Sequence, residues 1–387
     1  MEVTTTSFPF GAETLGTFGG CVSTGIICNV VEDQLMIIDA RVLPGSEGGA
    51  VISVNQDVVG IIVSPLVLKT GQLSGLSLVC EINEVLKSFR DVCYKNTLNS
   101  GVQFFHKTLS KGELCAEEKS GKINSAGVVV LENNKGWGSG VVVAINYKLK
   151  DNASIIIATC RHVVQPVADW GVRVQFCSGK NQVKRNGTII YKSKVSWLDF
   201  ALVKVDCDVT FSQRLIQDIS NFIKISHTCF VLKYETNYFK GVDVYATGHC
   251  LLEHHKNGPT ITHGILSNVL YLPQNAFNTF SKAVMLQTTC IVHDGASGGA
   301  VFSKLDNKLL GLIVNNVKEV FTEERFTLYP DVNFILPAVL FMPLLCKYLL
   351  GKMNVFENLD ILSESKEIQN VWFLGNSDEN QKIASKL

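Results

Sequence analysis

The sequence lacks net charge, paired cysteine motifs and long apolar runs. Its 35 Lys and Arg residues balance 35 Asp and Glu residues, so the formal net charge of the 387-residue chain is zero. A neutral chain has no global field that would draw it to nucleic acid or to an anionic membrane surface. We therefore expect no nucleic-acid partner.

The twelve cysteines contain no Cys-x-x-Cys pair, which excludes the usual zinc-cluster and thioredoxin-type spacings. The start, MEVTTTSFPF, has neither the basic flank nor the apolar core of a secretory signal. Free thiols in a reducing compartment are therefore expected. The most apolar run, 335–350, contains two prolines and a lysine and is shorter than the ~20 residues of a membrane span. We expect a buried helix there and no membrane span.

Short β-branched runs separated by glycine, asparagine and aspartate fill most of the chain. VVGIIV, GSGVVVAI and SIIIATC are examples, and this texture predicts an all-β barrel or sandwich. Helical periodicity is confined to about 81–90 and 336–352. The polar stretch 91–124 is expected to be a linker. Residues 353–387 are expected to form a polar tail, in which VWFLG (371–375) is able to dock on a neighbouring surface.

One glycine-rich loop occurs twice, as GSEGGAVI (45–52) and GASGGAVF (295–302). The flanking segments also match in order, GIICNV with GILSNV before the loop and VVGIIV with LLGLIV after it. Three matched segments indicate an internal repeat. Residues 1–90 thus repeat only the later half of what spans 125–345. Glu47 stands where the later copy has Ser297, and Ser46 is one residue out of register.

Three residues are candidates for nucleophilic catalysis. His162 follows an apolar strand in TCRHVV, Asp199 begins the run DFALVKV, and Ser297 lies in the later glycine loop. Each alone has a plain structural interpretation: a core histidine, a strand-capping aspartate and a tight turn. Together they occur in the order His, Asp, Ser, which is one of the known orders of the serine-protease triad.

These blocks resemble the active-site blocks of HtrA/Deg-type trypsin-like proteases. The resemblance covers about 125–345 and implies a chymotrypsin-like double β-barrel over 125–352, preceded by a degenerate, inactive half-domain at 1–90 that resembles a second barrel. It implies that Ser297 attacks the scissile carbonyl, that His162 transfers the proton, and that Asp199 orients the imidazole. Backbone N–H groups of Gly295 and Ser297 would form the oxyanion hole.

The resemblance further implies that no metal or organic cofactor is needed. It places the wall of the primary substrate pocket at Ile291, Val292 and His293 and at Ile313, Val314 and Asn315. No acidic residue is apparent at the pocket base, so a small or apolar side chain is favoured over Arg or Lys. Histidine and cysteine residues that could bind a metal also cluster in the sequence, but their spacing is not that of a known metal site. They are His249, Cys250, His254, His255 and His263.

The last three residues, Ser385, Lys386 and Leu387, form the peroxisomal address SKL, which an import receptor reads. With this address, the whole chain is similar to the peroxisomal leader-peptide-processing proteases. That family trims amino-terminal leaders and processes matrix enzymes of fatty-acid β-oxidation, often after cysteine. By this resemblance Cys115–Ala116 is a candidate self-cleavage bond, and the expected location is the peroxisomal matrix.

Two other functions stay open from the sequence. One is quality-control degradation of misfolded matrix proteins, and the other is non-catalytic peptide binding in a protease-like cleft. A homo-oligomer is also open.

Overall fold

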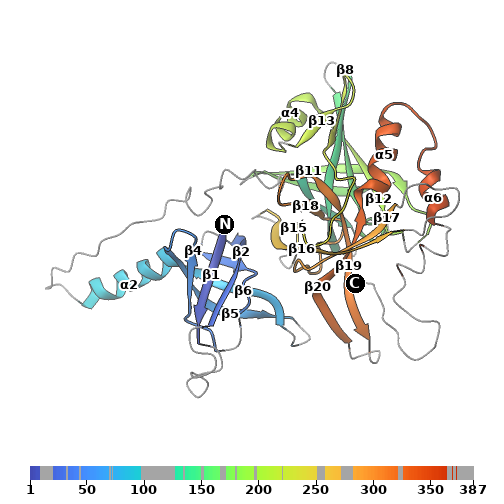
Figure 1. Ribbon diagram of the computed structural model, residues 1–387. Coiled ribbons are helices and arrows are strands. Elements are labelled where there is room, and N and C mark those ends of the chain that lie inside the picture. The colour runs from blue at the N-terminus through green and yellow to red at the C-terminus, as the bar shows by residue number, and fades with distance from the viewer. Residues whose placement is uncertain are drawn as a thin grey trace. The chain divides into compact units, whose positions relative to one another are not determined.

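A computed structural model describes most of the chain, which divides into two units, Met1–Gly121 and Lys122–Leu387 (Figure 1). The described residues are 1–8, 21–31, 34–42, 45–68, 71, 73–96, 127–133, 136–149, 152–165, 171–178, 181–195, 198–219, 221–250, 258–271, 282–320, 326–363, 368 and 372.

The first unit contains a closed barrel of six antiparallel strands in the order β1-β2-β3-β6-β5-β4. Its core is aliphatic, with Met36, Ile38 and Val79 fully buried. The strands are β1 (Glu2–Ser7), β2 (Cys21–Val31), β3 (Leu35–Ile38), β4 (Ala50–Ser53), β5 (Val58–Val67) and β6 (Leu73–Glu81).

Helix α2 (Ile82–Asn96) follows β6 directly. The Glu81 carboxylate caps its first turn by accepting hydrogen bonds from the backbone N–H groups of Asn83 at 2.9 Å and Glu84 at 3.3 Å. Such a cap satisfies N–H groups that have no partner within the helix. The helix continues to Asn96, six residues beyond the 81–90 stretch in which the sequence predicts helical periodicity.

The second unit begins with an eight-stranded sheet in the order β13-β14-β8-β7-β10-β11-β12-β9. An additional pairing of β8 with β9 closes six of these strands into a ring, in the order β8-β7-β10-β11-β12-β9. The strands are β7 (Val128–Asn133), β8 (Gly136–Leu149), β9 (Asn152–Thr159), β10 (Val172–Ser178), β11 (Asn181–Lys192), β12 (Ala201–Asp208), β13 (Phe222–Lys224) and β14 (Cys229–Leu232). Helix α4 (Val209–Asp218) follows β12 and is capped by the Asp208 carboxylate, which accepts from the Phe211 N–H.

A closed six-stranded barrel completes the β part of this unit, in the order β15-β16-β17-β20-β19-β18. Its strands are β15 (Asp243–Gly248), β16 (Thr260–Tyr271), β17 (Ala283–Thr288), β18 (Ala300–Ser303), β19 (Leu309–Val320) and β20 (Phe326–Pro337). The two halves give a chymotrypsin-like pair of barrels, which confirms the expected all-β class.

The barrel of the first unit has the same connectivity as the β15–β20 barrel, strand for strand. Val3 pairs with Ser53 across β1 and β4, and Val244 pairs with Ser303 across β15 and β18. The sequence repeat is therefore also a repeat of strand order and local register.

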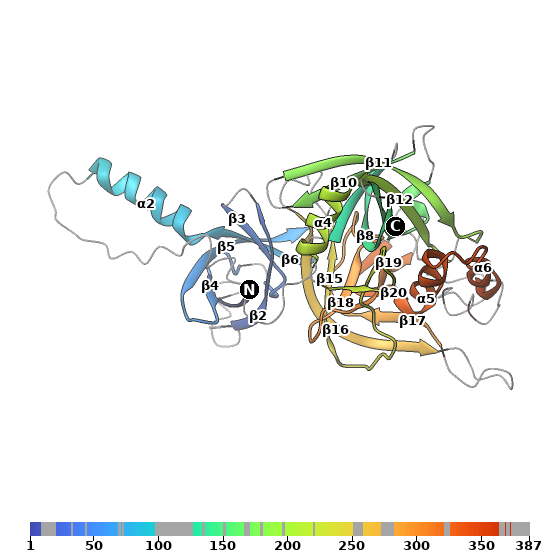
Figure 2. The same cartoon turned by 90° about the horizontal axis from the view of Figure 1, so that it is seen from above.

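Two helices follow the last barrel, α5 (Ala338–Leu349) and α6 (Glu357–Ser363). Figures 1 and 2 both show them beside each other. The stretch expected to be a polar tail contributes to the core of this unit, because several of its apolar side chains are buried. These are Val355, Phe356, Leu359, Ile368 and Trp372. The expectation that residues near 371–375 dock on a neighbouring surface is thus met at Trp372.

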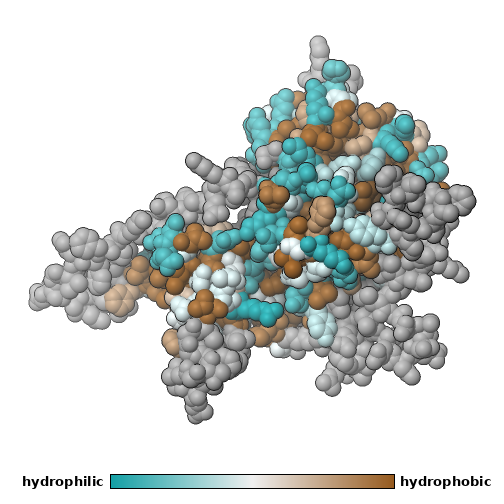
Figure 3. Space-filling model, in the orientation of Figure 1, coloured by the Kyte–Doolittle hydropathy of each residue, from teal (hydrophilic) through white to brown (hydrophobic). Residues whose placement is uncertain are grey.

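Hydrophilic and hydrophobic residues are intermixed over the coloured part of the face shown in Figure 3. In the part of the chain that the structure describes, no helix is both long and apolar enough to cross a membrane.

Candidate active site

His162 and Asp199 are held against each other beside β9 and β12. His162 opens a short 3₁₀ helix, His162–Val164, just after β9, and Asp199 lies just before β12. β9 and β12 are paired neighbours, with Thr159 opposite Ala201. One Asp199 oxygen accepts the His162 backbone N–H at 2.9 Å and the other faces the imidazole Nδ1. The carboxylate thus fixes both the backbone and the ring of His162.

Ser297 lies in the loop between β17 and β18, and two left-handed glycines shape this loop. Gly295 has φ +90° and Gly298 has φ +82°, values that glycine adopts without steric cost. A Cβ on Gly298 would lie 2.1 Å from the Ser139 carbonyl oxygen and 3.1 Å from the Cys160 backbone nitrogen. The loop therefore packs against the strand end that leads into His162.

Hydrogen bonds join the same loop to β8. The Ser139 backbone N–H donates to the Ser297 carbonyl at 2.8 Å, and the Ser139 hydroxyl donates to the Gly295 carbonyl at 2.7 Å. The structure thus places the loop that carries Ser297, from the second half of the unit, against β8 and the end of β9, next to the His162–Asp199 pair of the first half.

Three backbone N–H groups of the loop donate to backbone carbonyls, and two others do not. Ala296 N–H donates to the His293 carbonyl, Gly298 N–H to the Ile313 carbonyl and Gly299 N–H to the Ala296 carbonyl. Within the described residues, the N–H groups of Gly295 and Ser297 make no such bond. These are the two donors predicted for an oxyanion hole.

The Ser297 hydroxyl donates to the Val314 carbonyl at 3.2 Å, and the residue is 8% exposed. In the structure the Ser297 hydroxyl is therefore bonded to the backbone of β19. The His162 side chain is more open, since 42% of it is exposed.

The residues predicted for the substrate pocket lie on two segments that contact the Ser297 loop. Ile313 and Val314 accept from Gly298 and Ser297, as described above, and Val292 N–H donates to the Pro330 carbonyl at 2.9 Å. Val292, His293, Ile313 and Val314 are buried, whereas Ile291 and Asn315 are partly exposed. All six predicted pocket positions therefore lie on, or next in sequence to, residues that are hydrogen-bonded to the Ser297 loop or belong to the segment that leads into it.

Two buried asparagines that the sequence did not single out hold one of these segments. Asn316 Nδ2 donates to the Val292 carbonyl at 2.5 Å, and Asn333 Nδ2 donates to the Cys290 carbonyl. The two face each other across β19 and β20. Their only signal in the sequence is that each polar residue stands in an apolar strand.

Cys160 is buried next to the His162–Asp199 pair. Its thiol donates to the Ile313 carbonyl at 3.2 Å. Burial, followed by the charge of Asp199, raises the pKa of this thiol well above its usual value, and a hydrogen bond from Gly298 partly offsets this. The possible ligand atoms of Cys160, His162 and Asp199 lie within 4.8 Å of one another, the one such group in the part of the chain that is described.

The histidine-rich segment near 249–263 does not form such a group among its described members. His249 is buried, with its Nε2 3.2 Å from the Val128 carbonyl oxygen. His263 Nε2 lies 3.3 Å from Asp243 Oδ1. His254 and His255 lie outside the described residues, as do Cys115, Ala116, Ser385, Lys386 and Leu387.

The equivalent loop of the first unit has the same backbone but different side chains. Gly45 and Gly48 have φ +87° and +84°, and Gly48 N–H donates to the Ile62 carbonyl as Gly298 N–H does to Ile313. Ser46 is buried and accepts a hydrogen bond from the Ser7 hydroxyl at 3.0 Å, while Glu47 is exposed. Ser46 is therefore turned inward and engaged, as expected from its register.

Comparison with known families finds a match over residues 138–312 to the model of the trypsin-like peptidase domain. The matched range contains His162, Asp199 and Ser297. A solved structure, the MamO protease domain from Magnetospirillum magneticum, matches with a TM-score of 0.36 and 15% identity, covering 57% of this chain and 96% of that one.

Two curated relatives have the same name, peroxisomal leader peptide-processing protease. The human protein is 29% identical over 88% of this chain and 54% of its own length, and the mouse protein is 28% identical over 95% of this chain and 58% of its own length. The chain thus spans little more than half the length of these relatives. The second unit thus contains a region, 138–312, that is similar to trypsin-like peptidase domains, and most of the chain is similar to these two proteases.

Proposed function

We propose that this chain is a peroxisomal leader-peptide-processing endopeptidase that works through His162, Asp199 and Ser297. The observation that carries the proposal is the bonding of the Ser297 loop to the strand ends that hold the His162–Asp199 pair. The names of the human and mouse relatives support the class of substrate.

The proposed reaction begins when the Ser297 hydroxyl turns toward His162 and attacks the scissile carbonyl. His162 takes the hydroxyl proton and later gives it to the leaving amine, while Asp199 keeps the Nδ1 side of the ring oriented and stabilises the imidazolium. The N–H groups of Gly295 and Ser297 bind the developing oxyanion, and one such donor contributes about 10²–10³ in rate. The acyl-enzyme is then hydrolysed by water.

The proposed substrates are imported proteins that carry amino-terminal targeting leaders, including matrix enzymes of fatty-acid β-oxidation. The apolar side chains of Val292, Ile313 and Val314, at three of the predicted pocket positions, support a small or apolar side chain before the cut bond. Self-cleavage at Cys115–Ala116 belongs to the same proposal. Delivery to the peroxisomal matrix would use Ser385, Lys386 and Leu387 and the import receptor.

The test is incubation of the full chain with a leader-bearing β-oxidation enzyme, followed by sequencing of the new amino terminus. One discrete new terminus, absent with the Ser297→Ala variant, is the expected result. Many small peptides would favour quality-control degradation instead, and an uncut substrate would favour non-catalytic peptide binding.

A further inference from the structure

A buried carboxylate of α6 contacts the end of β11, just before the turn that carries Asp199. Asp360 is 6% exposed. Its Oδ1 accepts from the Tyr191 hydroxyl at 2.9 Å and from the Lys194 backbone N–H at 3.4 Å, and its Oδ2 lies 3.5 Å from Lys194 Nζ. A buried carboxylate is costly unless it is paired and hydrogen-bonded. All of these partners come from one short stretch, so Asp360 fixes α6 to that stretch.

Ser193, next to Lys194 in the sequence, forms hydrogen bonds across the turn between β11 and β12. Its backbone N–H donates to the Phe200 carbonyl at 3.0 Å, and its hydroxyl donates to the carbonyls of Val195 at 3.1 Å and Leu198. Asp199 lies between Leu198 and Phe200. The backbone on both sides of Asp199 is thus bonded to Ser193, the neighbour of Lys194.

The residue before His162 holds the same Lys194 from the other side. Arg161 Nη1 donates to the Lys194 carbonyl at 3.1 Å. Lys194 is therefore bonded through its N–H to Asp360 and through its carbonyl to Arg161. This chain of contacts connects α6 with the neighbours of both His162 and Asp199.

Tyr191, which donates its hydroxyl hydrogen bond to Asp360, also packs its ring against aromatic residues of the core. Its ring stacks on Phe356, with centroids 4.8 Å apart and planes at 27°, and lies 5.9 Å from Phe200, the neighbour of Asp199. Burial, followed by the hydrogen bond to Asp360, raises the pKa of the Tyr191 hydroxyl. The hydroxyl therefore remains a proton donor to Asp360 across the ordinary pH range.

We propose that Asp360 is a positioning residue for Asp199, and that α6 supports the active site by clamping the Lys194 peptide. Asp360 touches no reacting group and acts through the turn. The inference rests on the proposed function, because it assumes that Asp199 orients His162 during catalysis.

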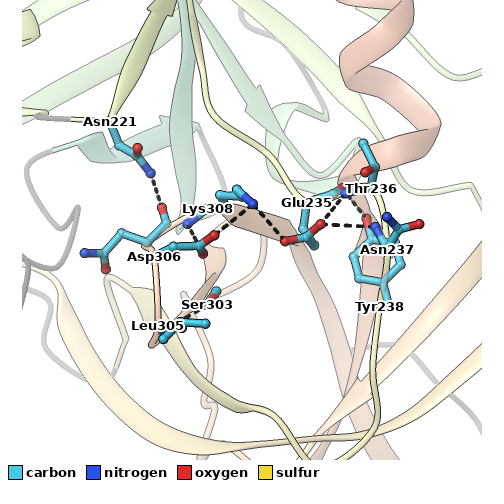
Figure 4. Close-up of polar contacts among 10 residues, drawn as sticks. Asn221, Glu235, Thr236, Asn237, Tyr238, Ser303, Leu305, Asp306 and Lys308 are labelled. Atoms are coloured by element: carbon cyan, nitrogen blue, oxygen red, sulfur yellow. Dashed lines mark hydrogen bonds and ion pairs between the residues drawn. The ribbon is translucent and has the colours of Figure 1, made fainter.

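Four variants of the full chain separate the parts of this contact. Asp360→Ala removes every bond, Tyr191→Phe removes the hydroxyl and keeps the ring stack, and Lys194→Ala removes the ammonium and keeps the peptide N–H. Asp306→Ala is the matched control. Asp306 also pairs with a lysine, at 2.8 Å from Lys308 Nζ, in a network with Glu235 that includes no residue of the 191–199 stretch (Figure 4).

The readouts are kcat and KM on a leader-bearing substrate and the rate of Ser297 labelling by a fluorophosphonate, each measured well below the unfolding temperature of every variant. Small misplacements of catalytic groups cost up to about 100-fold. Asp360→Ala is expected to lower kcat about 10- to 100-fold with KM within about twofold of wild type, and Tyr191→Phe to lower it less. Lys194→Ala and Asp306→Ala are expected to match wild type, since the Lys194 side chain is 73% exposed and exposed ion pairs contribute little to stability.

A folded Asp360→Ala protein with wild-type kcat would overturn the inference, and so would an equal loss in Lys194→Ala, which would assign the effect to the ion pair. If Asp360→Ala does not fold, Asp360→Asn replaces it, because the amide keeps one acceptor oxygen. Its kcat is expected to lie between those of wild type and Tyr191→Phe. Wild-type kcat in both Asp360→Asn and Tyr191→Phe would overturn the inference. Unlabelled wild-type protein would overturn the proposed function, and the inference with it. Labelling of wild type and Asp360→Ala at equal rates would overturn the inference alone.

Discussion

The hydroxyl of Ser139 donates to the carbonyl of Gly295 at 2.7 Å and so ties β8 to the loop that carries Ser297. The same hydroxyl accepts the His249 backbone N–H at 2.8 Å. One side chain therefore satisfies two buried backbone groups on the second barrel. The position of the Ser297 loop relative to β8 depends on it.

Replacing this hydroxyl is expected to weaken both folding and activity. Ser139→Ala leaves the Gly295 carbonyl and the His249 N–H without their partner, and a buried unsatisfied group costs about 1–3 kcal/mol. We expect a loss of about 2–4 kcal/mol in the free energy of unfolding, measured with urea, and a lower kcat. Ser267→Ala is the control, because Ser267 also donates to a carbonyl but is exposed. Equal unfolding free energies for the two variants would contradict the prediction.

The repeated loop gives a matched pair of glycine substitutions. Gly298→Ala and Gly48→Ala both place a side chain at positive φ, which costs about 1–3 kcal/mol. A Cβ on Gly298 also meets the Ser139 carbonyl oxygen at 2.1 Å, whereas a Cβ on Gly48 meets no atom within 4 Å. Thermal unfolding and hydrolysis should show a large loss for Gly298→Ala, including loss of activity. Gly48→Ala should cause a small loss of stability and keep activity; the reverse order would refute the packing argument.

Buried thiols should make the second unit less stable at alkaline pH. Burial raises the pKa of Cys250 and that of Cys207 to about 11, and it raises the pKa of Cys160 as well. A free thiol in an unfolded chain ionises near ~8.5. The folded state therefore keeps protons that the unfolded state loses, and stability falls as pH rises from about 8.5 toward 11, by up to about 1.4 kcal/mol per pH unit for each thiol.

Urea unfolding at pH 7.5, 9 and 10 measures this slope. Cys250→Ala should show a shallower decline than wild type, because one raised pKa is gone. Identical slopes for the two proteins would show that Cys250 does not contribute.

The loop of the first unit should stay inactive when its missing serine is supplied. Glu47→Ser, made in the Ser297→Ala background, creates GSSGGAVI at 45–52, but residues 1–90 contain no histidine to activate a hydroxyl. We expect no fluorophosphonate labelling and no hydrolysis. Labelling at position 47 would mean that a base from elsewhere reaches this loop.

The catalytic candidates and the repeat were predictable because they depend on local chemistry. Gly298 and Gly48 were recognisable from the matching loops, and both adopt the left-handed conformation that only glycine takes easily. The order of His162, Asp199 and Ser297 predicted a common site, and the structure pairs His162 with Asp199 and packs the Ser297 loop against the end of β9.

The supports of the site were not predictable, because they join segments far apart in the chain. Asp360 lies in a stretch that looked like a polar tail, and its contact with Tyr191 spans 169 positions. Phe356 and Leu359 had a helical spacing that would have indicated a buried face. Cys160 gave no signal of its own, since a buried cysteine resembles any small apolar residue.

The central claim is that Ser297 is a nucleophile activated by His162 and Asp199, and active-site labelling tests it most directly. The full chain is treated with a fluorophosphonate, and the modified residue is located by peptide mass spectrometry in wild type, Ser297→Ala and His162→Ala. The account predicts one label on Ser297 in wild type and none at that site in either variant. No label in folded wild-type protein, or equal labelling of Ser297 when His162 is absent, would contradict it.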